Sequence, residues 1–172
     1  MTGFDIDGFR SRITVAACKA VEKFKSEMPE AEICGFALYS DSDATSVASS
    51  FNTVTHLAVM QAEYPEDPFC FKWNPSEWSH EGFGEEFFED LSSDMLKLSQ
   101  SFSNFTEFEA YRSDVFNVCV DVLKELRKVE LKEVIFVFSI TDSILPEMQI
   151  KWIGSINTPL ETAEFERWIV QQ

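Results

Sequence analysis

The fold prediction for this chain starts from the segment Val134-Ile135-Phe136-Val137-Phe138-Ser139-Ile140. It is a continuous apolar run of strand length and is rich in β-branched residues. Such a run is typical of a buried strand, because a strand with one solvated face alternates between apolar and polar residues. We therefore expect a central strand here, covered on both faces of its sheet.

The neighbouring patterns predict two hairpins. Residues 32–40 and 45–51 have strand character, and Ser40-Asp41-Ser42-Asp43 between them is typical of a turn. Residues 148–156 follow the apolar run closely and place Ile150 and Trp152 on one face of a further strand. We expect each pair of strands to form a hairpin.

Helices are expected around these strands. Apolar residues recur at helical spacing over residues 9–28, 85–102 and 107–128. Asn52-Thr53 and Asn157-Thr158-Pro159 have the residue types that begin helices, which predicts one helix up to about residue 64 and a last one near the C-terminus. Residues 65–84 are less regular, and we expect an ordered loop with a short helical turn over residues 75–78.

These elements together predict an α+β fold. Two hairpins imply an antiparallel sheet, and the helices would pack on it. The chain shows no internal repeat and no linker, and 172 residues are enough to bury one core. We expect a single α+β domain over residues 1–172.

The charge restricts the classes of partner. The chain has 30 acidic and 14 basic residues, a formal net charge of −16. Such a charge repels nucleic acid and anionic membranes, whereas it attracts a basic protein. The alternative is that the acids only keep the protein soluble. No secretory signal and no membrane-length apolar stretch is evident, so we expect a cytoplasmic protein that binds neither nucleic acid nor membrane.

Acidic and aromatic residues alternate most densely between Glu63 and Asp94. Aromatic anchors with a rim of carboxylates are what a surface for a basic partner needs. The predicted partner-binding residues are Glu66, Asp67, Trp73, Glu77, Trp78, Glu81, Glu85, Glu86, Glu89 and Asp90. The alternative is that the aromatics belong to the core and the acids form a solvated helix face.

Catalytic, metal and cofactor sites are not expected. Glu77 and His80 form a Glu-x-x-His pair, but a di-metal site needs a second copy, and the only other histidine, His56, does not supply one. The surroundings of Cys18 and Cys119 are apolar, which favours reduced, unreactive thiols. The chain has no glycine-rich phosphate loop.

Trp73-Asn74-Pro75-Ser76-Glu77-Trp78 resembles the W-x-P-x-E-W signature of a bacterial domain-of-unknown-function family, the one numbered 4303. Residues 34–39, followed by Asn52-Thr53, resemble that family's early strand. Residues 150–157 resemble its closing tryptophan-serine-asparagine strand. Together these segments span roughly residues 33–157.

The resemblance implies an immunity-type protein, a cytoplasmic antidote that binds a cognate toxin domain. Combined with the charge, it predicts an antitoxin for a basic polymorphic toxin such as a nuclease. The main alternative is a non-catalytic adaptor or regulatory module, and a carboxylate- or metal-dependent enzyme is the less favoured one. The family provides no catalytic residues to transfer to this chain.

Overall fold

The computed structural model describes residues 4–129, 131, 133–141 and 145–171 of the chain. The α-helices are α1 (Ile6–Glu27), α2 (Val54–Glu63), α3 (Cys70–Trp73), α4 (Glu89–Ser99), α5 (Phe105–Val129), α6 (Pro146–Ile156) and α7 (Pro159–Ile169). Two short 3-10 helices are η1 (Pro75–Glu77) and η2 (Glu85–Phe87). The strands are β1 (Ile33–Ser40), β2 (Val47–Thr53), β3 (His80–Glu81) and β4 (Ile135–Ile140).

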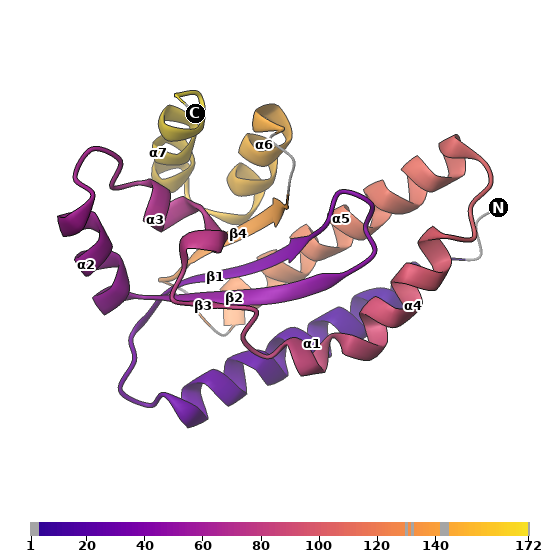
Figure 1. Ribbon diagram of the computed structural model, residues 1–172, viewed down its shortest axis with the longest axis horizontal. Coiled ribbons are helices and arrows are strands. Elements are labelled where there is room, and N and C mark those ends of the chain that lie inside the picture. Colours follow the sequence, from indigo (N-terminus) through magenta and orange to yellow (C-terminus); the bar gives the residue numbers. More distant parts are fainter. Residues whose placement is uncertain (1–3, 130, 132, 142–144, 172) are drawn as a thin grey trace.

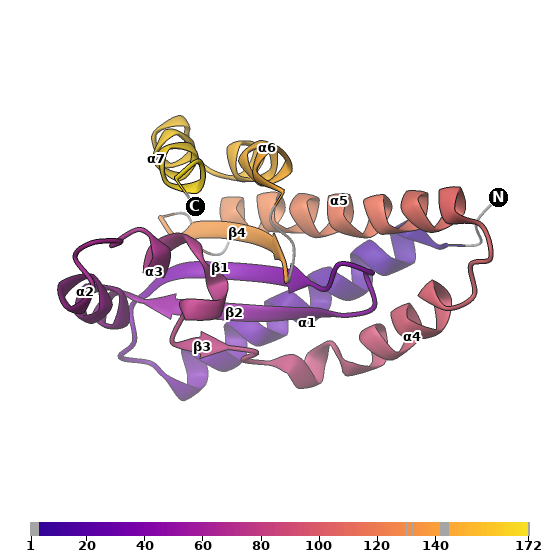
Figure 2. The same ribbon diagram turned by 45° about the horizontal axis from the view of Figure 1, so that its top comes forward.

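The sheet is mixed. Its strand order is β3-β2-β1-β4, and Figure 2 shows the strands in this sequence. β2 is antiparallel to both β1 and β3, whereas β4 is parallel to β1. The α+β class is confirmed, and the predicted β1–β2 hairpin forms. The purely antiparallel sheet is wrong, because α5 carries the chain back to the end of the sheet where β1 begins.

The apolar run forms β4, with both faces covered as predicted. Phe136 and Phe138 belong to one core cluster, and Ile135 and Val137 belong to the other. The predicted central position is wrong, since β4 is the last strand in the sheet order. An apolar run reports the burial of a strand's faces but not the number of its neighbours.

The predicted strand over residues 148–156 is wrong, because these residues belong to α6. Alternation of Ile150 and Trp152 suggested a strand, but the buried residues of α6 are Trp152, Ile153 and Ile156. The separations of three and four residues from Ile153 and Trp152 to Ile156 define a helical face. Pro146 stands in the first turn of α6, where its missing N–H leaves no hydrogen bond unmade. The second hairpin is therefore absent from the described fold.

The sheet separates two packed layers (Figures 1 and 2). Helices α1, α4 and α5 pack on the face that carries Phe36, Phe51 and Phe136. On the other face, Ala37 and Val137 pack with residues of α3, α6 and α7. In Figure 1 the α3–η1 segment crosses one end of β1 and β2, and no helix is drawn in front of their hairpin end.

Most predicted helices are confirmed, with small differences at their ends. Thr53 caps α2 as expected, and Thr158 and Glu161 form a capping box at the start of α7. The expected helix from residue 85 instead begins as η2, and regular α-helix starts at Glu89 after a 3-10 turn. Because of this break, the exposed carboxylates of the segment belong to two different elements, η2 and α4.

Candidate partner-binding surface

The structure divides the predicted partner-binding residues into exposed acids and buried aromatics. Seven carboxylates are exposed: Glu66, Glu77, Glu81, Glu85, Glu86, Glu89 and Asp90. Asp67 is half-buried. Trp73 and Trp78 are only 1% and 5% exposed. The segment therefore presents charge outward and keeps its indole rings inside.

Trp73 and Trp78 fix the α3–η1 segment to the sheet. The Trp73 Nε1 donates a hydrogen bond of 3.0 Å to Glu164 of α7. Trp78 lies over Gly35 of β1, where an added Cβ would approach the Trp78 Cη2 to 2.9 Å. The absence of a side chain at Gly35 leaves the space that this indole occupies. Both tryptophans thus have internal contacts of the kind expected of core residues.

Two predicted acids also have internal partners. Asp67 accepts a hydrogen bond of 3.0 Å from Trp168 Nε1 and one of 3.2 Å from the Cys70 backbone N–H. Glu86 forms an ion pair with Lys23 of α1, and the hydrogen bond from Lys23 lowers the pKa of Glu86. These two carboxylates are part of the protein's own packing and charge balance.

Glu81 and Glu85 lie near Tyr39 of β1: a Cβ added at Gly82 would meet the Glu85 Oε2 at 3.7 Å and the Tyr39 hydroxyl at 3.8 Å. Burial raises the pKa of the Tyr39 hydroxyl, and the negative charges of Glu81 and Glu85 raise it further. Within the described ranges, no basic side chain forms an ion pair with either carboxylate. Glu89 and Asp90 follow in the first turn of α4; both are exposed, and neither forms an ion pair among the described residues. These four carboxylates form what we call the acidic edge.

The Glu-x-x-His pair does not form a metal site. Glu77 ends η1 and His80 begins β3, so the two residues do not share a helix face. The His80 ring packs edge-on against Phe24 at 5.0 Å, and burial lowers the pKa of His80, as does the nearby His56. Among the residues that the structure describes, no group of three histidine, cysteine or carboxylate side chains is arranged to hold a metal ion.

Three of the four thiols are not activated. Burial raises the pKa of Cys34 to about 11, and burial likewise raises the pKa values of Cys70 and Cys119. A nucleophilic cysteine needs the opposite shift, because the thiolate is the reactive form. These thiols stay protonated at neutral pH.

A cavity of about 500 Å³ opens between the α3–η1 segment, the C-terminal half of β4, and helices α6 and α7. Its aromatic wall consists of Trp73, Phe165 and Trp168, with neighbouring ring centroids 5.3 and 5.8 Å apart. Ser139 of β4 and Thr141, which follows that strand, line it as well. No local pattern in the sequence indicates this cavity, because its walls come from distant parts of the chain.

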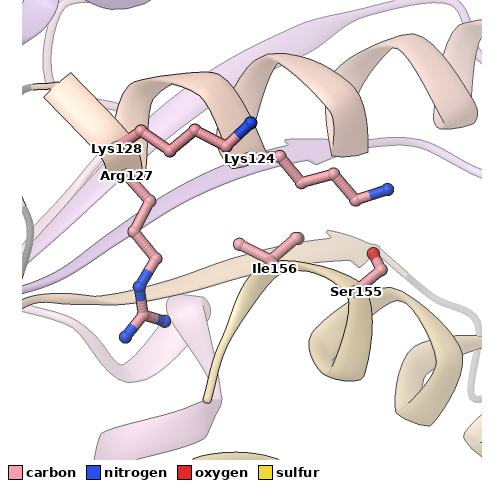
Figure 3. Close-up of a pocket in the computed structure, with 5 residues that line it drawn as sticks. All are labelled: Lys124, Arg127, Lys128, Ser155 and Ile156. Carbon is pink, nitrogen blue, oxygen red and sulfur yellow. The ribbon is translucent and has the colours of Figure 1, made fainter.

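A second cavity, of about 340 Å³, has a basic lining between α5 and α6. The residues that line it, drawn in Figure 3, are Lys124, Arg127, Lys128, Ser155 and Ile156. Each cation is already paired, at 3.5, 2.8 and 2.8 Å, with Asp121, Glu161 and Glu125 respectively. Because its cations already have internal partners, this second cavity is a poor site for an anion.

Comparison with known families gives one match. Residues 13–151 match the family described as domain of unknown function DUF4303. The chain belongs to this family. Comparisons with curated proteins and with solved structures give no match. No helix in the described part of the chain is long and apolar enough to cross a membrane.

Segments that resemble the DUF4303 family meet on one face of the sheet. Gly35 of the early strand lies under Trp78, and a Cβ at Gly35 would also come within 3.2 Å of the Asn52 Cβ. The Asn52 Nδ2 donates a hydrogen bond of 2.8 Å to the Phe71 carbonyl. These contacts hold the α3–η1 segment in place and explain the residue types without a partner.

The closing segment has a different role from the strand that the resemblance implied. Asn157 follows α6 and reaches the outer edge of β4 with its side-chain amide. It accepts from the Phe136 N–H at 2.9 Å and donates to the Phe136 carbonyl at 2.7 Å. The amide thus makes the two hydrogen bonds that a neighbouring strand would make.

Proposed function

We propose that this member of the DUF4303 family is an immunity protein that binds a basic toxin domain, such as a nuclease, in the cytoplasm. The observation that carries the proposal is the acidic edge, Glu81, Glu85, Glu89 and Asp90, whose carboxylates are exposed and form no ion pair among the described residues. Two other carboxylates, Glu86 and Glu161, are already paired with Lys23 and Arg127. The unpaired edge leaves its charge for a partner.

The mechanism follows from the charge. A net charge of −16 attracts a basic domain over a long range and raises its association rate. At contact, the carboxylates of the acidic edge would occupy positions where nucleic-acid phosphates bind a nuclease. Binding then blocks the toxin's site without any chemical step. Electrostatic attraction of this kind weakens as salt concentration rises.

The test is affinity capture with the tagged protein from its own host, at low and high salt, read by mass spectrometry. The interaction with the captured partner is then measured for a triple variant, Glu81→Lys, Glu85→Lys and Glu89→Lys. The matched control reverses three exposed glutamates outside the acidic edge, Glu22→Lys, Glu30→Lys and Glu166→Lys, so that both variants have the same net charge.

We expect a basic toxin domain whose affinity falls at least about 100-fold for the acidic-edge variant, about 2.7 kcal/mol, and much less for the control. High salt should weaken the wild-type complex. A partner whose binding ignores both salt and the reversals would contradict the proposal. Capture of a metabolic complex instead would support the adaptor alternative.

A further inference from the structure

The cavity beside β4 has the properties of an anchor site for a bulky apolar side chain. Its volume of about 500 Å³ lies within the usual range of ligand sites, about 300–1,000 Å³. Three aromatic residues form one wall, while Asn74, Ser139 and Gln149 add uncharged polar groups. Among the described residues, none that lines the cavity carries a charge.

The aromatic wall is held in place before any ligand arrives. Trp73 donates to Glu164 and Trp168 donates to Asp67, both at 3.0 Å. These hydrogen bonds fix the two indoles from outside the cavity, because neither carboxylate lines it. A site with fixed walls loses little entropy when it is filled, which favours affinity.

The cavity and the acidic edge are joined across the open face of the sheet. Ser139, which lines the cavity, pairs in register with Tyr39 of β1, and Tyr39 pairs with Ala48 of β2. All three are half-buried. The Tyr39 hydroxyl lies next to Gly82, which follows Glu81, since a Cβ added at Gly82 would be 3.8 Å from that hydroxyl and 3.7 Å from the Glu85 Oε2. A continuous, partly exposed path therefore leads from an uncharged cavity to unpaired carboxylates.

The strand order sets the length of this path. Three inter-strand spacings separate β4 from β3, roughly 14 Å in total at about 4.8 Å each. An extended peptide covers that distance in about four residues, at about 3.3 Å per residue. An anionic ligand is disfavoured on this face, because Glu81 and Glu85 and the net charge of −16 repel it.

From this arrangement we infer that the open sheet face binds an extended segment of the basic partner, with a bulky apolar side chain in the cavity and an arginine or lysine about four residues away at Glu81 and Glu85. The inference rests on the proposed function and specifies how the partner is recognised. Apolar anchors in preformed pockets, next to charged contacts at the rim, carry most of the energy of many interfaces.

The probe is a synthetic peptide, acetyl-Gly-Phe-Thr-Ser-Thr-Arg-Gly-amide, in which phenylalanine and arginine are four residues apart. One control replaces its phenylalanine with alanine, a second replaces its arginine with glutamine, and a third places the two residues adjacent. Each peptide is titrated into the ¹⁵N-labelled protein, and amide shifts are followed at Tyr39, Gly82 and Ser139.

Two cavity variants complete the test. Ser139→Trp and Ser76→Trp each place an indole in the cavity lining, and Leu160→Trp adds the same side chain at a position that is 79% exposed. Two-dimensional spectra of the variants verify folding before titration. Ser76 is itself exposed, so its replacement keeps the test valid if Ser139→Trp does not fold.

We expect the spaced peptide to shift all three amides and to bind at least about tenfold more tightly than any control. Either cavity variant should remove this preference, and Leu160→Trp should keep it. Shifts that do not depend on phenylalanine, or no shifts at these amides, would overturn the inference. If arginine alone decides binding, the anchor fails while the proposed function stands. If the cavity binds the peptide but charge reversal leaves partner binding unchanged, the proposed function fails.

Discussion

At the scale of single residues, the two buried tryptophans of the α3–η1 segment differ in one atom's surroundings. The Trp73 Nε1 donates to the Glu164 carboxylate, whereas the buried Trp78 Nε1 has no hydrogen-bond partner among the described residues. A buried donor without a partner is destabilising, while a hydrogen bond to a charged group is among the stronger ones. The same substitution therefore has different consequences at the two positions.

We expect Trp73→Phe to lower the free energy of unfolding by about 1–3 kcal/mol more than Trp78→Phe, because only the first loses a hydrogen bond to a carboxylate. Both changes remove a similar ring area, so each serves as the other's control. Chemical denaturation of the two variants measures the difference. Equal losses, or a larger loss for Trp78→Phe, would contradict the assignment of these roles.

Asp41 shows how one side chain organises the β1–β2 turn. Its carboxylate accepts from the Asp43 and Thr45 backbone N–H groups at 2.9 and 3.0 Å, and from the Thr45 and Ser46 hydroxyls at 2.8 Å. Burial alone would raise the pKa of Asp41, but these hydrogen bonds outweigh it and lower the pKa below its ordinary value of 3.8.

Because the folded-state pKa of Asp41 is lowered, its contribution to stability is present above about pH 4 and is lost as pH falls through the folded value. We expect Asp41→Asn to cost about 1–3 kcal/mol at pH 7, since it removes the charge that several donors share. The loss should shrink in more acidic solution. Unfolding titrations of wild type and variant at pH 7 and pH 3 provide the measurement, and a loss that grows with acidity would refute the account.

At the scale of elements, the outer edge of β4 depends on Asn157. Its amide makes both hydrogen bonds to Phe136, and its Oδ1 also accepts from Arg127 of α5. We expect Asn157→Leu to cost about 2–5 kcal/mol, because it leaves the Phe136 N–H and carbonyl buried and unpaired. Thr158→Ala, which removes only the helix cap of α7, should cost about 1 kcal/mol. Thermal or chemical unfolding that ranks the two variants in the reverse order would exclude an edge-capping role.

The same region shows why sequence patterns reached their limit at α6. Met148, Ile150 and Trp152 alternate like strand residues, while Trp152, Ile153 and Ile156 fit a helix equally well. Only the tertiary structure distinguishes the strand from the helix here. β4 is the edge strand, α6 packs beside it, and Asn157 makes the hydrogen bonds of a neighbouring strand at that edge. Isolated signals were reliable where caps were explicit, as at Thr53 and Thr158.

At the scale of the whole molecule, sequence predicted which groups are charged but not which are available. Composition and spacing indicated the acidic segment, and seven of its eight predicted carboxylates are exposed. Only tertiary structure shows that Glu86 is neutralised by Lys23 and that both tryptophans are internal. The cavity joins residues 70–76 to residues 137–141 and 165–169, a proximity with no local signature.

The net charge itself should limit stability. Thirty acidic residues against 14 basic ones repel one another in the compact state, while the surface ion pairs of α1, such as Arg12–Asp94 at 2.9 Å, are each worth little. Salt screens both the repulsion and the ion pairs, and the repulsion among the many carboxylates without an ion pair is the larger of the two contributions to stability. We expect sodium chloride, raised from low concentration to about 0.5 M, to increase the free energy of unfolding by about 1 kcal/mol.

The control for this prediction is the Glu22→Lys, Glu30→Lys and Glu166→Lys variant, whose smaller net charge should reduce the gain from salt. Potassium sulfate is unsuitable as the screening salt, because sulfate also strengthens apolar burial. Denaturation in urea, which is uncharged, keeps the ionic strength defined throughout. A fall in stability with added sodium chloride would mean that ion pairs outweigh repulsion, and the unpaired acidic edge would then cost the fold less than its charge indicates.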